Sequence, residues 1–402
     1  MNKKAIAILG AIFLLIVGTL GFLVYSKYYG NSTPTNQPTL APSPAPTPTP
    51  TPLTPTPAPT PTPDPTFNPS PIPTTTPDSA DNPSTIVQLT DDQVVSPVLF
   101  FNGLGVTYLD KQGHLFQADL QESNGTLSLT GKKQIDIPLK ANINKILWPN
   151  LGRDFIAQIK NASGFNSWSY FDHTTALYTD LPPQVESLDW TPAGDKIMYV
   201  WLDKDKSTLN LGNPDSSNYK KIGDMWENDD TISISPDGSQ VLYYESNNAS
   251  STNAINSVTA DGKLWKSLVK TGNNFGVLWS PDSQKFLFTK KDPSTQKYQL
   301  WVYSLVSGEA KNLGLFTGLN KVVWDKDSNI IYAAVPNSGS VSETSLTVDS
   351  FFRMDTSNLN KKQYGPSNIS IDGRDLFLNS TSDKLFFRNA LDGGLYYLDL
   401  AK

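Results

Sequence analysis

The sequence predicts an all-β fold, a seven-bladed β-propeller that follows one N-terminal transmembrane helix and a disordered stalk rich in proline and threonine. Three observations predict it: an uncharged apolar run near the start, a proline-dense segment after that run, and a motif that then recurs every 42 to 45 residues. The expected parts are a short cytoplasmic end (1–4), the transmembrane helix (5–25), the linker (26–84) and the propeller (85–402).

The apolar run from Ala5 to Tyr25 is long enough to cross a bilayer, because about 20 apolar residues in a helix span the hydrocarbon core. Lys3 and Lys4 precede the run, and basic residues at this position favour a cytoplasmic N-terminus. The propeller is therefore expected outside the cytoplasm, in an extracellular or periplasmic location on a single-pass membrane protein. A cleaved signal peptide is the alternative, but the run is long for a signal core and no small-x-small site follows it directly.

The segment between the apolar run and the repeats consists mainly of proline, threonine and serine, and it holds most of the 31 prolines of the chain. Such a segment buries too little apolar surface to offset the entropy of ordering, so we expect an unfolded linker. Dense proline stiffens it toward polyproline II at about 3.1 Å per residue, which gives a reach on the order of 150 Å. The linker would hold the folded domain away from the membrane.

Five segments of the remaining chain share one pattern, in which an apolar run, a turn and a second apolar run follow each other. They are ILWPNLGRDFIAQ, LDWTPAGDKIMYV, ISISPDGSQVLYY, VLWSPDSQKFLFT and VVWDKDSNIIYAA. The last residue of the first run recurs at Trp148, Trp190, Ile234, Trp279 and Trp324. This spacing is that of a propeller blade. Weaker copies at 97–110 and 376–389 bring the number of blades to seven, with six and eight as the alternatives.

Each copy is expected to form the inner hairpin of a blade. In GVLWSPDSQKFLFTK (276–290), proline sets φ for the turn and aspartate bonds back to nearby amides, while glycine accepts positive φ in the sister copies. We therefore interpret the serine, aspartate and lysine of this copy as turn residues and solvent-facing strand positions, and the tryptophans as core. The segment STIVQLT (84–90) belongs to no hairpin, and we predict that it supplies the fourth strand of the last blade and closes the ring.

The motifs WSPDS, ISPDG and WTPAG resemble the repeats of TolB-like propellers, also called WD-repeat-like propellers, and those of the propeller domain in the dipeptidyl peptidase IV family. The resemblance covers the repeat region and implies a propeller fold. Two departures separate this chain from both families. A membrane helix and a linker stand where TolB-like proteins have an α/β domain, and neither a hydrolase domain nor a G-x-S-x-G motif is present, so the catalytic residues of the peptidases match nothing here.

Residues suited to catalysis or metal binding are few. The chain has no cysteine, and we interpret its two histidines, His114 and His173, as structural. The alternating carboxylates at 203–207 and 325–329 lack the remainder of an EF-hand loop. We therefore predict no catalytic residue, no metal site, no cofactor and no enzymatic activity. The formal net charge of −6 also argues against a nucleic-acid partner, which requires a basic face.

Recognition is the function that remains. In a propeller, the loops between second and third strands and those between blades gather on one face, and four large apolar residues fall in such loops: Phe165, Trp168, Trp226 and Phe275. We predict that they bind a protein or a cell-envelope glycan; the alternative is that they pack beneath the loops as satellite core. Two other hypotheses are an extracytoplasmic glycan hydrolase or lyase with acids at the channel mouth, and a TolB-like accessory subunit of an envelope complex.

Overall fold

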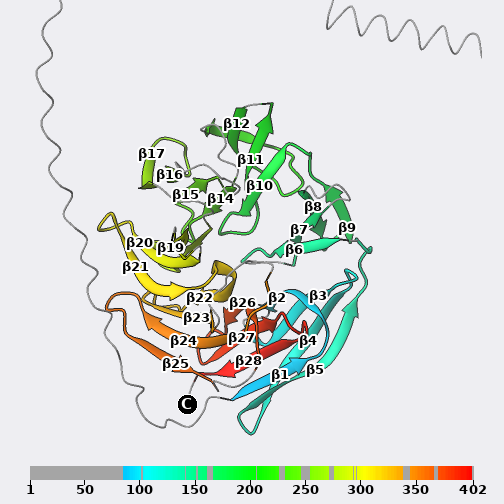
Figure 1. Cartoon of the computed structure of the whole chain (residues 1–402). Coiled ribbons are helices and arrows are strands. Elements are labelled where there is room, and N and C mark those ends of the chain that lie inside the picture. The colour runs from blue at the N-terminus through cyan, green and yellow to red at the C-terminus, as the bar shows by residue number, and fades with distance from the viewer. Residues whose placement is uncertain are drawn as a thin grey trace, which may run out of the picture. The chain divides into compact units, whose positions relative to one another are not determined.

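The repeat region forms seven four-stranded antiparallel sheets arranged as the blades of a β-propeller in the computed structural model (Figure 1). The structure describes residues 85–400, except for short stretches at 101–102, 141, 151–152, 161–165, 205, 226–230, 246–253, 271–275, 293, 296, 338–344 and 366–369. The expected membrane helix (5–25) and linker (26–84) lie outside these residues. Among the described residues, no helix has the length and apolar character needed to cross a membrane.

In blades 1 to 6 the strands follow one another in chain order, beginning with the innermost. Blades 1 and 2 contain β2 (Val94–Phe100), β3 (Gly105–Asp110), β4 (Leu115–Ser123) and β5 (Thr126–Ile135), then β6 (Ile143–Leu147), β7 (Phe155–Lys160), β8 (Asn166–Asp172) and β9 (Leu177–Asp180). Blades 3 and 4 contain β10 (Val185–Trp190), β11 (Ile197–Asp203), β12 (Lys206–Gly212) and β13 (Lys220–Asp224), then β14 (Thr231–Ile234), β15 (Gln240–Tyr244), β16 (Ala254–Thr259) and β17 (Trp265–Lys270).

Blades 5 and 6 contain β18 (Val277–Trp279), β19 (Lys285–Lys291), β20 (Tyr298–Ser304) and β21 (Glu309–Phe316), then β22 (Val322–Trp324), β23 (Ile330–Pro336), β24 (Asp349–Asp355) and β25 (Lys361–Tyr364). Blade 7 contains β26 (Gly373–Leu378), β27 (Lys384–Asn389), β28 (Leu395–Asp399) and β1 (Ile86–Thr90). A single turn of 3-10 helix, η2 (Leu319–Lys321), leads into blade 6.

The ring closes where the sequence predicts. Strand β1 pairs antiparallel with β28, with Ile86 opposite Leu398 and Val87 opposite Tyr397. The last blade therefore takes its outer strand from the start of the domain, which removes two exposed sheet edges. The closing strand predicted within residues 84–90 is confirmed.

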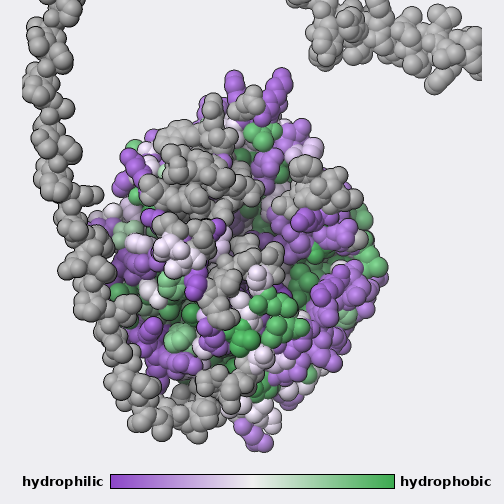
Figure 2. All heavy atoms as spheres, in the orientation of Figure 1, coloured by the Kyte–Doolittle hydropathy of each residue, from purple (hydrophilic) through white to green (hydrophobic). Residues whose placement is uncertain are grey.

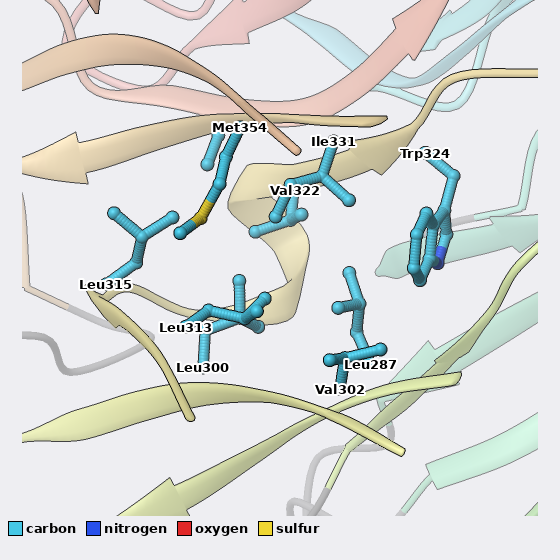
Figure 3. Close-up of a cluster of buried hydrophobic side chains, with 10 residues drawn as sticks. Leu287, Leu300, Val302, Leu313, Leu315, Val322, Trp324, Ile331 and Met354 are labelled. Carbon is cyan, nitrogen blue, oxygen red and sulfur yellow. The ribbon is translucent and has the colours of Figure 1, made fainter. Parts of the chain in front are cut away.

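The hydrophobic core lies between neighbouring blades. Figure 3 shows one such layer, in which Leu287 and Leu300 of blade 5 face Val322, Ile331 and Met354 of blade 6. The alternation of apolar residues along each strand produces this arrangement, because one face of every blade packs on the preceding blade and the other face on the next blade.

The repeated tryptophans join blades 2, 3, 5 and 6 to the blade before each of them. Every indole Nε1–H donates to a carbonyl oxygen of the preceding inner strand, over 2.8 to 3.2 Å; the pairs are Trp148 with Ser96, Trp190 with Leu147, Trp279 with Ser233 and Trp324 with Leu278. The prediction that these tryptophans belong to the core is confirmed.

The turn of the motif also joins blades, and here the sequence interpretation was wrong in part. Ser280 and Ser283 are buried, not solvent-facing. Ser283 has φ of 59°, and the same turn position holds Gly238 with φ of 72° in blade 4. The serine side chain in this position accepts a hydrogen bond of 3.0 Å from the Asp237 N–H of the preceding turn. Lys285 likewise reaches the next blade, donating to Asn329 Oδ1 over 2.6 Å.

Candidate functional site

The two faces of the propeller carry different connections. The turns between first and second strands and those between third and fourth strands meet on one face, where Leu305 N–H donates to Gln284 O over 2.9 Å. We call this the turn face. The connections between second and third strands and those between blades meet on the other face, where Met225 N–H donates to Ser207 O over 2.9 Å. We call this the loop face, and binding is predicted there.

Of the four residues predicted to bind a ligand, only Trp168 lies within the described part of the chain. Phe165, Trp226 and Phe275 lie outside the described residues. Nothing therefore tests the prediction for these three, and it stays a prediction.

Trp168 is a core residue, and the expectation that it occupies a solvated loop was wrong. It lies in β8, opposite Gln158 of β7. The two strands are paired along their length, beginning with Asn166 opposite Lys160. The residue is 7% exposed, and its indole N–H donates to Glu186 O over 3.2 Å. The alternative considered for this residue, packing as core, is the one that the structure supports.

A cluster of charged side chains that the sequence analysis missed lies on the loop face, between blades 6 and 7. It consists of Lys321 at the end of η2, Asp349 at the start of β24, Asp372 just before β26, and Arg374 in β26. Lys321 Nζ lies 2.5 Å from a carboxylate oxygen of Asp349 and 2.5 Å from one of Asp372. The side chains of Lys321, Asp349 and Asp372 are 3%, 0% and 0% exposed, so the charges are removed from water.

The rest of the hydrogen-bonding capacity of this charged cluster is also used. Arg374 donates to both carboxylate oxygens of Asp372, from Nε over 3.0 Å and from Nη2 over 2.9 Å. Asp349 accepts from Thr347 Oγ1 over 2.8 Å and from Gly373 N–H over 2.8 Å. Two cationic and two anionic side chains therefore compensate one another, as buried charges require.

The two carboxyl groups nevertheless differ in their electrostatic environment. Burial raises the pKa of Asp349, and this effect outweighs the opposing charge of Lys321. Burial also acts on Asp372, but hydrogen bonds from Arg374 and Lys321 outweigh it and hold the pKa of Asp372 below its ordinary value. The environment thus favours the ionised form of Asp372 and disfavours that of Asp349.

The charged cluster anchors the surface segment 345–349. Thr347 N–H donates to Asp372 Oδ2 over 3.1 Å, and Ser345 O accepts from Arg374 Nη2 over 2.8 Å. The two residues on either side of Thr347 point outward, with Leu346 63% and Val348 37% exposed. The segment therefore exposes two aliphatic side chains on a backbone that Asp372 and Arg374 hold by hydrogen bonds. Figure 2 shows that hydrophobic side chains are exposed among hydrophilic ones elsewhere on the propeller as well.

The inner strands carry a second set of polar groups. Asp189 of β10 accepts 2.9 Å hydrogen bonds from Ile234 N–H of the next blade and from Trp190 N–H. Burial raises the pKa of Asp189 to about 6, against the effect of these bonds. In β26, a bulge places Asp375 at φ of 54°, and its carboxylate accepts a 2.7 Å bond from Arg388 Nε.

The two histidines contact neighbouring polar residues. His114 Nδ1 lies 2.8 Å from Asp110 Oδ2, and His173 Nε2 lies 3.4 Å from an Arg153 guanidinium nitrogen. His173 N–H also donates to Asp154 Oδ1 over 2.9 Å. These contacts fit the structural role predicted for both residues. In the described part of the chain, no group of three or more His, Asp or Glu side chains has the geometry of a metal site.

Comparison with known proteins relates this chain to others by fold. No family model and no curated protein sequence matches it. Among solved structures, an oligogalacturonate lyase in complex with manganese aligns with a TM-score of 0.57 and 10% identity, covering 81% of this chain and 99% of that chain. The β-propeller domain of Cps50 (Swd1) from Myceliophteria thermophila aligns with a TM-score of 0.52 and 8% identity, covering 78% and 99%.

TolB from Acinetobacter baumannii is also similar, with a TM-score of 0.42 and 14% identity over 76% of this chain and 79% of that chain. The propeller fold that the repeats indicate is shown by the seven four-stranded blades and agrees with the similarity to the Cps50 (Swd1) propeller domain. That similarity extends to no particular ligand or activity.

Proposed function

We propose that the protein is a membrane-anchored β-propeller outside the cytoplasm that serves as a binding or scaffold module for a protein or a cell-envelope glycan. The observation that supports this most directly is the anchored segment 345–349, where Leu346 and Val348 are exposed on a backbone held by the buried charged cluster. Exposed aliphatic side chains on a preorganised backbone lose little conformational entropy on binding.

The path of the chain supports the same assignment. Strand β1 starts beside Leu398, near the turn-face end of β28, where Leu400 N–H donates to the Asp383 carbonyl of the blade 7 turn. The first described strand of the domain therefore begins at the turn face. A propeller tethered through that face leaves the loop face free for a partner.

A glycan hydrolase or lyase is the other candidate, and it would require carboxyl groups that reach a substrate. Asp349 and Asp372 are close together, but neither side chain has exposed surface and each is bonded to at least two neighbours. Their position favours support of the overlying segment over acid-base chemistry on a bound sugar. Similarity to oligogalacturonate lyases concerns the fold alone.

The proposal is tested by quantitative capture of partners from intact membranes with the full chain and two variants. Replacing Leu346 and Val348 by serine is expected to reduce capture about tenfold or more, since loss of apolar anchors at the centre of an interface has effects of this size. Leu177→Ser is the matched control, because Leu177 is 61% exposed at the start of β9, at the turn face. Equal capture by wild type and the loop-face double variant would contradict the proposal, as would loss of capture in the control.

A further inference from the structure

The charged cluster between blades 6 and 7 has the composition and geometry of a site that forms a covalent bond. Lys321 Nζ lies 2.5 Å from oxygens of two different carboxyl groups, and all three side chains are 3% exposed or less. Phe351 and Ile371, which are close in sequence to Asp349 and Asp372, belong to a buried apolar cluster and are 3% and 2% exposed. An amine held against a carboxyl group, with a second carboxylate in contact with the same nitrogen, is placed for condensation to an amide.

We propose that Lys321 and Asp349 join through an intramolecular isopeptide bond between Lys321 Nζ and Asp349 Cγ, with Asp372 as the proton acceptor. The bond forms within the folded propeller and needs no other reactant, since all three groups are already in contact.

The hydrogen-bond partners distinguish the roles of the two carboxyl groups. Lys321 donates to both carboxylates. Asp349 also accepts from two neutral donors, the hydroxyl of Thr347 and the N–H of Gly373, and such donors stabilise the oxyanion that forms when an amine attacks a carboxyl carbon. Asp372 is instead bound by both arms of the Arg374 guanidinium, which keeps it anionic and able to accept a proton. The raised pKa of Asp349 favours the neutral acid form that an amine attacks.

The reaction balances without an oxidant or an added group. Asp372 takes one proton from the Lys321 ammonium and passes it to the Asp349 carboxylate, which gives a free amine and a neutral carboxylic acid. The amine nitrogen attacks Cγ, and a new C–N bond forms. Asp372 then moves a second proton from that nitrogen to a hydroxyl on Cγ, the C–O bond breaks, and one water molecule leaves. Asp372 ends the reaction ionised, as it began.

The product is better suited to a buried site than the reactants. The amide replaces one positive and one negative charge, and Asp372 and Arg374 remain as a compensated pair. Removing a buried ion pair in favour of neutral groups lowers the cost of desolvation. The bond would also connect the entry to β22 with the start of β24, so that it encloses β22 and β23 in a covalent loop. The chain has no cysteine and therefore no disulfide with which to do this.

Peptide mapping of the full chain by mass spectrometry tests the proposal. Trypsin does not cleave after an amidated lysine, so residues 312–326 should appear joined to residues 327–353, at the sum of the two peptide masses minus one water. The uncleaved linear peptide 312–353 has the same mass, so fragmentation of the joined species must show two N-termini, at Asn312 and Asp327. The mass of the intact chain should also be one water lower than the sequence requires. Lys384 is the internal control, because its closest carboxylate oxygen, on Asp399, lies 3.4 Å away. Trypsin should cleave after Lys384 normally.

A peptide 312–321 with unmodified Lys321, together with a free peptide 327–353, would overturn the proposal. A linkage of Lys321 to residues 363–374 would overturn the assignment of Asp349, since it would place the bond on Asp372. Asp372→Asn should abolish the joined peptide in folded protein, as judged by near-ultraviolet circular dichroism. Full linkage in that variant would exclude Asp372 as the proton acceptor. If the variant does not fold, the wild-type peptide map alone decides whether the bond exists.

Discussion

The polar contacts that connect neighbouring blades, here called joints, are of two kinds in this propeller. From blade 1 to blade 6 they rely mainly on neutral groups at repeated positions. The Trp279 indole donates to Ser233 O, and the Ser283 hydroxyl accepts from Asp237 N–H. Between blades 6 and 7 the principal polar contact is a buried set of four charged side chains around Lys321. The repeated residues thus specify the ring, whereas the charged cluster, which is not part of the repeat, holds the surface segment 345–349 in position.

The difference also has an energetic meaning. A neutral hydrogen bond contributes about 1 kcal/mol and can be lost singly without a large effect. Charges buried together depend on one another, because removing one leaves another without compensation at a cost of several kcal/mol. The joint between blades 6 and 7 should therefore be the one most sensitive to single substitutions.

Lys321→Met should produce the largest effect. It leaves the carboxylates of Asp349 and Asp372 with only the Arg374 guanidinium, and we expect a loss of about 3–5 kcal/mol in the free energy of unfolding. Urea unfolding followed by tryptophan fluorescence measures this loss. The matched variant is Lys285→Met, which removes a lysine that joins blades 5 and 6 through neutral oxygens of Ser328 and Asn329. It should cost about 1 kcal/mol. Equal losses in the two variants would remove the distinction between the two kinds of joint.

The joint between blades 3 and 4 contains a carboxyl group, that of Asp189, where most other joints use neutral groups. Its substitution therefore shows how a single buried charge affects a joint of the repeated kind. Blade 4 has Ile234 at the tryptophan position, and Ile234 N–H donates to Asp189 instead. Burial raises the pKa of Asp189 to about 6, so the folded state holds this proton more tightly than the unfolded state does. The stability that protonation provides is present below the unfolded pKa and is lost as the pH rises through about 6.

Asp189→Asn keeps an oxygen acceptor for Ile234 N–H and removes the titration. We expect the variant to match wild type near pH 4 and to be more stable by about 1–3 kcal/mol at pH 7. Urea unfolding of both proteins across this pH range gives the difference directly, since the other titrating groups are common to both. A difference independent of pH would show that Asp189 titrates normally in the folded protein.

The regular joints could be predicted from sequence because their residues recur. The spacing from Trp148 to Trp324 predicts the blades, and an unpaired strand at 84–90 predicts the closure by β1. The sequence did not indicate that turn serines such as Ser283 bond across blades, because a polar residue in a turn resembles a solvated one. The available signal was that Ser283 stands at the turn position where sister copies have glycine, at Gly194 and Gly238.

The charged cluster could not be predicted in the same way. Lys321, Asp349 and Asp372 are far apart in sequence, none belongs to the repeated motif, and charged residues next to strands are usually exposed. Only the pairing of blades 6 and 7 brings them together. The prediction that Trp168 lies in a loop was wrong for a related reason. Strand β8 begins earlier than the polar sequence before it suggests, so Trp168 lies in a paired strand.

The smallest expected effect concerns one indole hydrogen bond and tests whether the repeated tryptophans act as joints or only fill space. Trp279→Phe retains an aromatic ring and removes the N–H that donates to Ser233 O over 3.2 Å, so the free energy of unfolding should fall by about 1 kcal/mol beyond the loss of packing. Trp301→Phe is the control, because Trp301 Nε1 is buried and has no hydrogen-bond partner among the described residues. Because Trp301→Phe removes an unsatisfied N–H, it should lower the free energy of unfolding less than Trp279→Phe does, or should raise it. The difference between the two variants in urea unfolding isolates the hydrogen bond. If both lose the same amount, the indoles serve packing alone, and the regular joints depend on their turns.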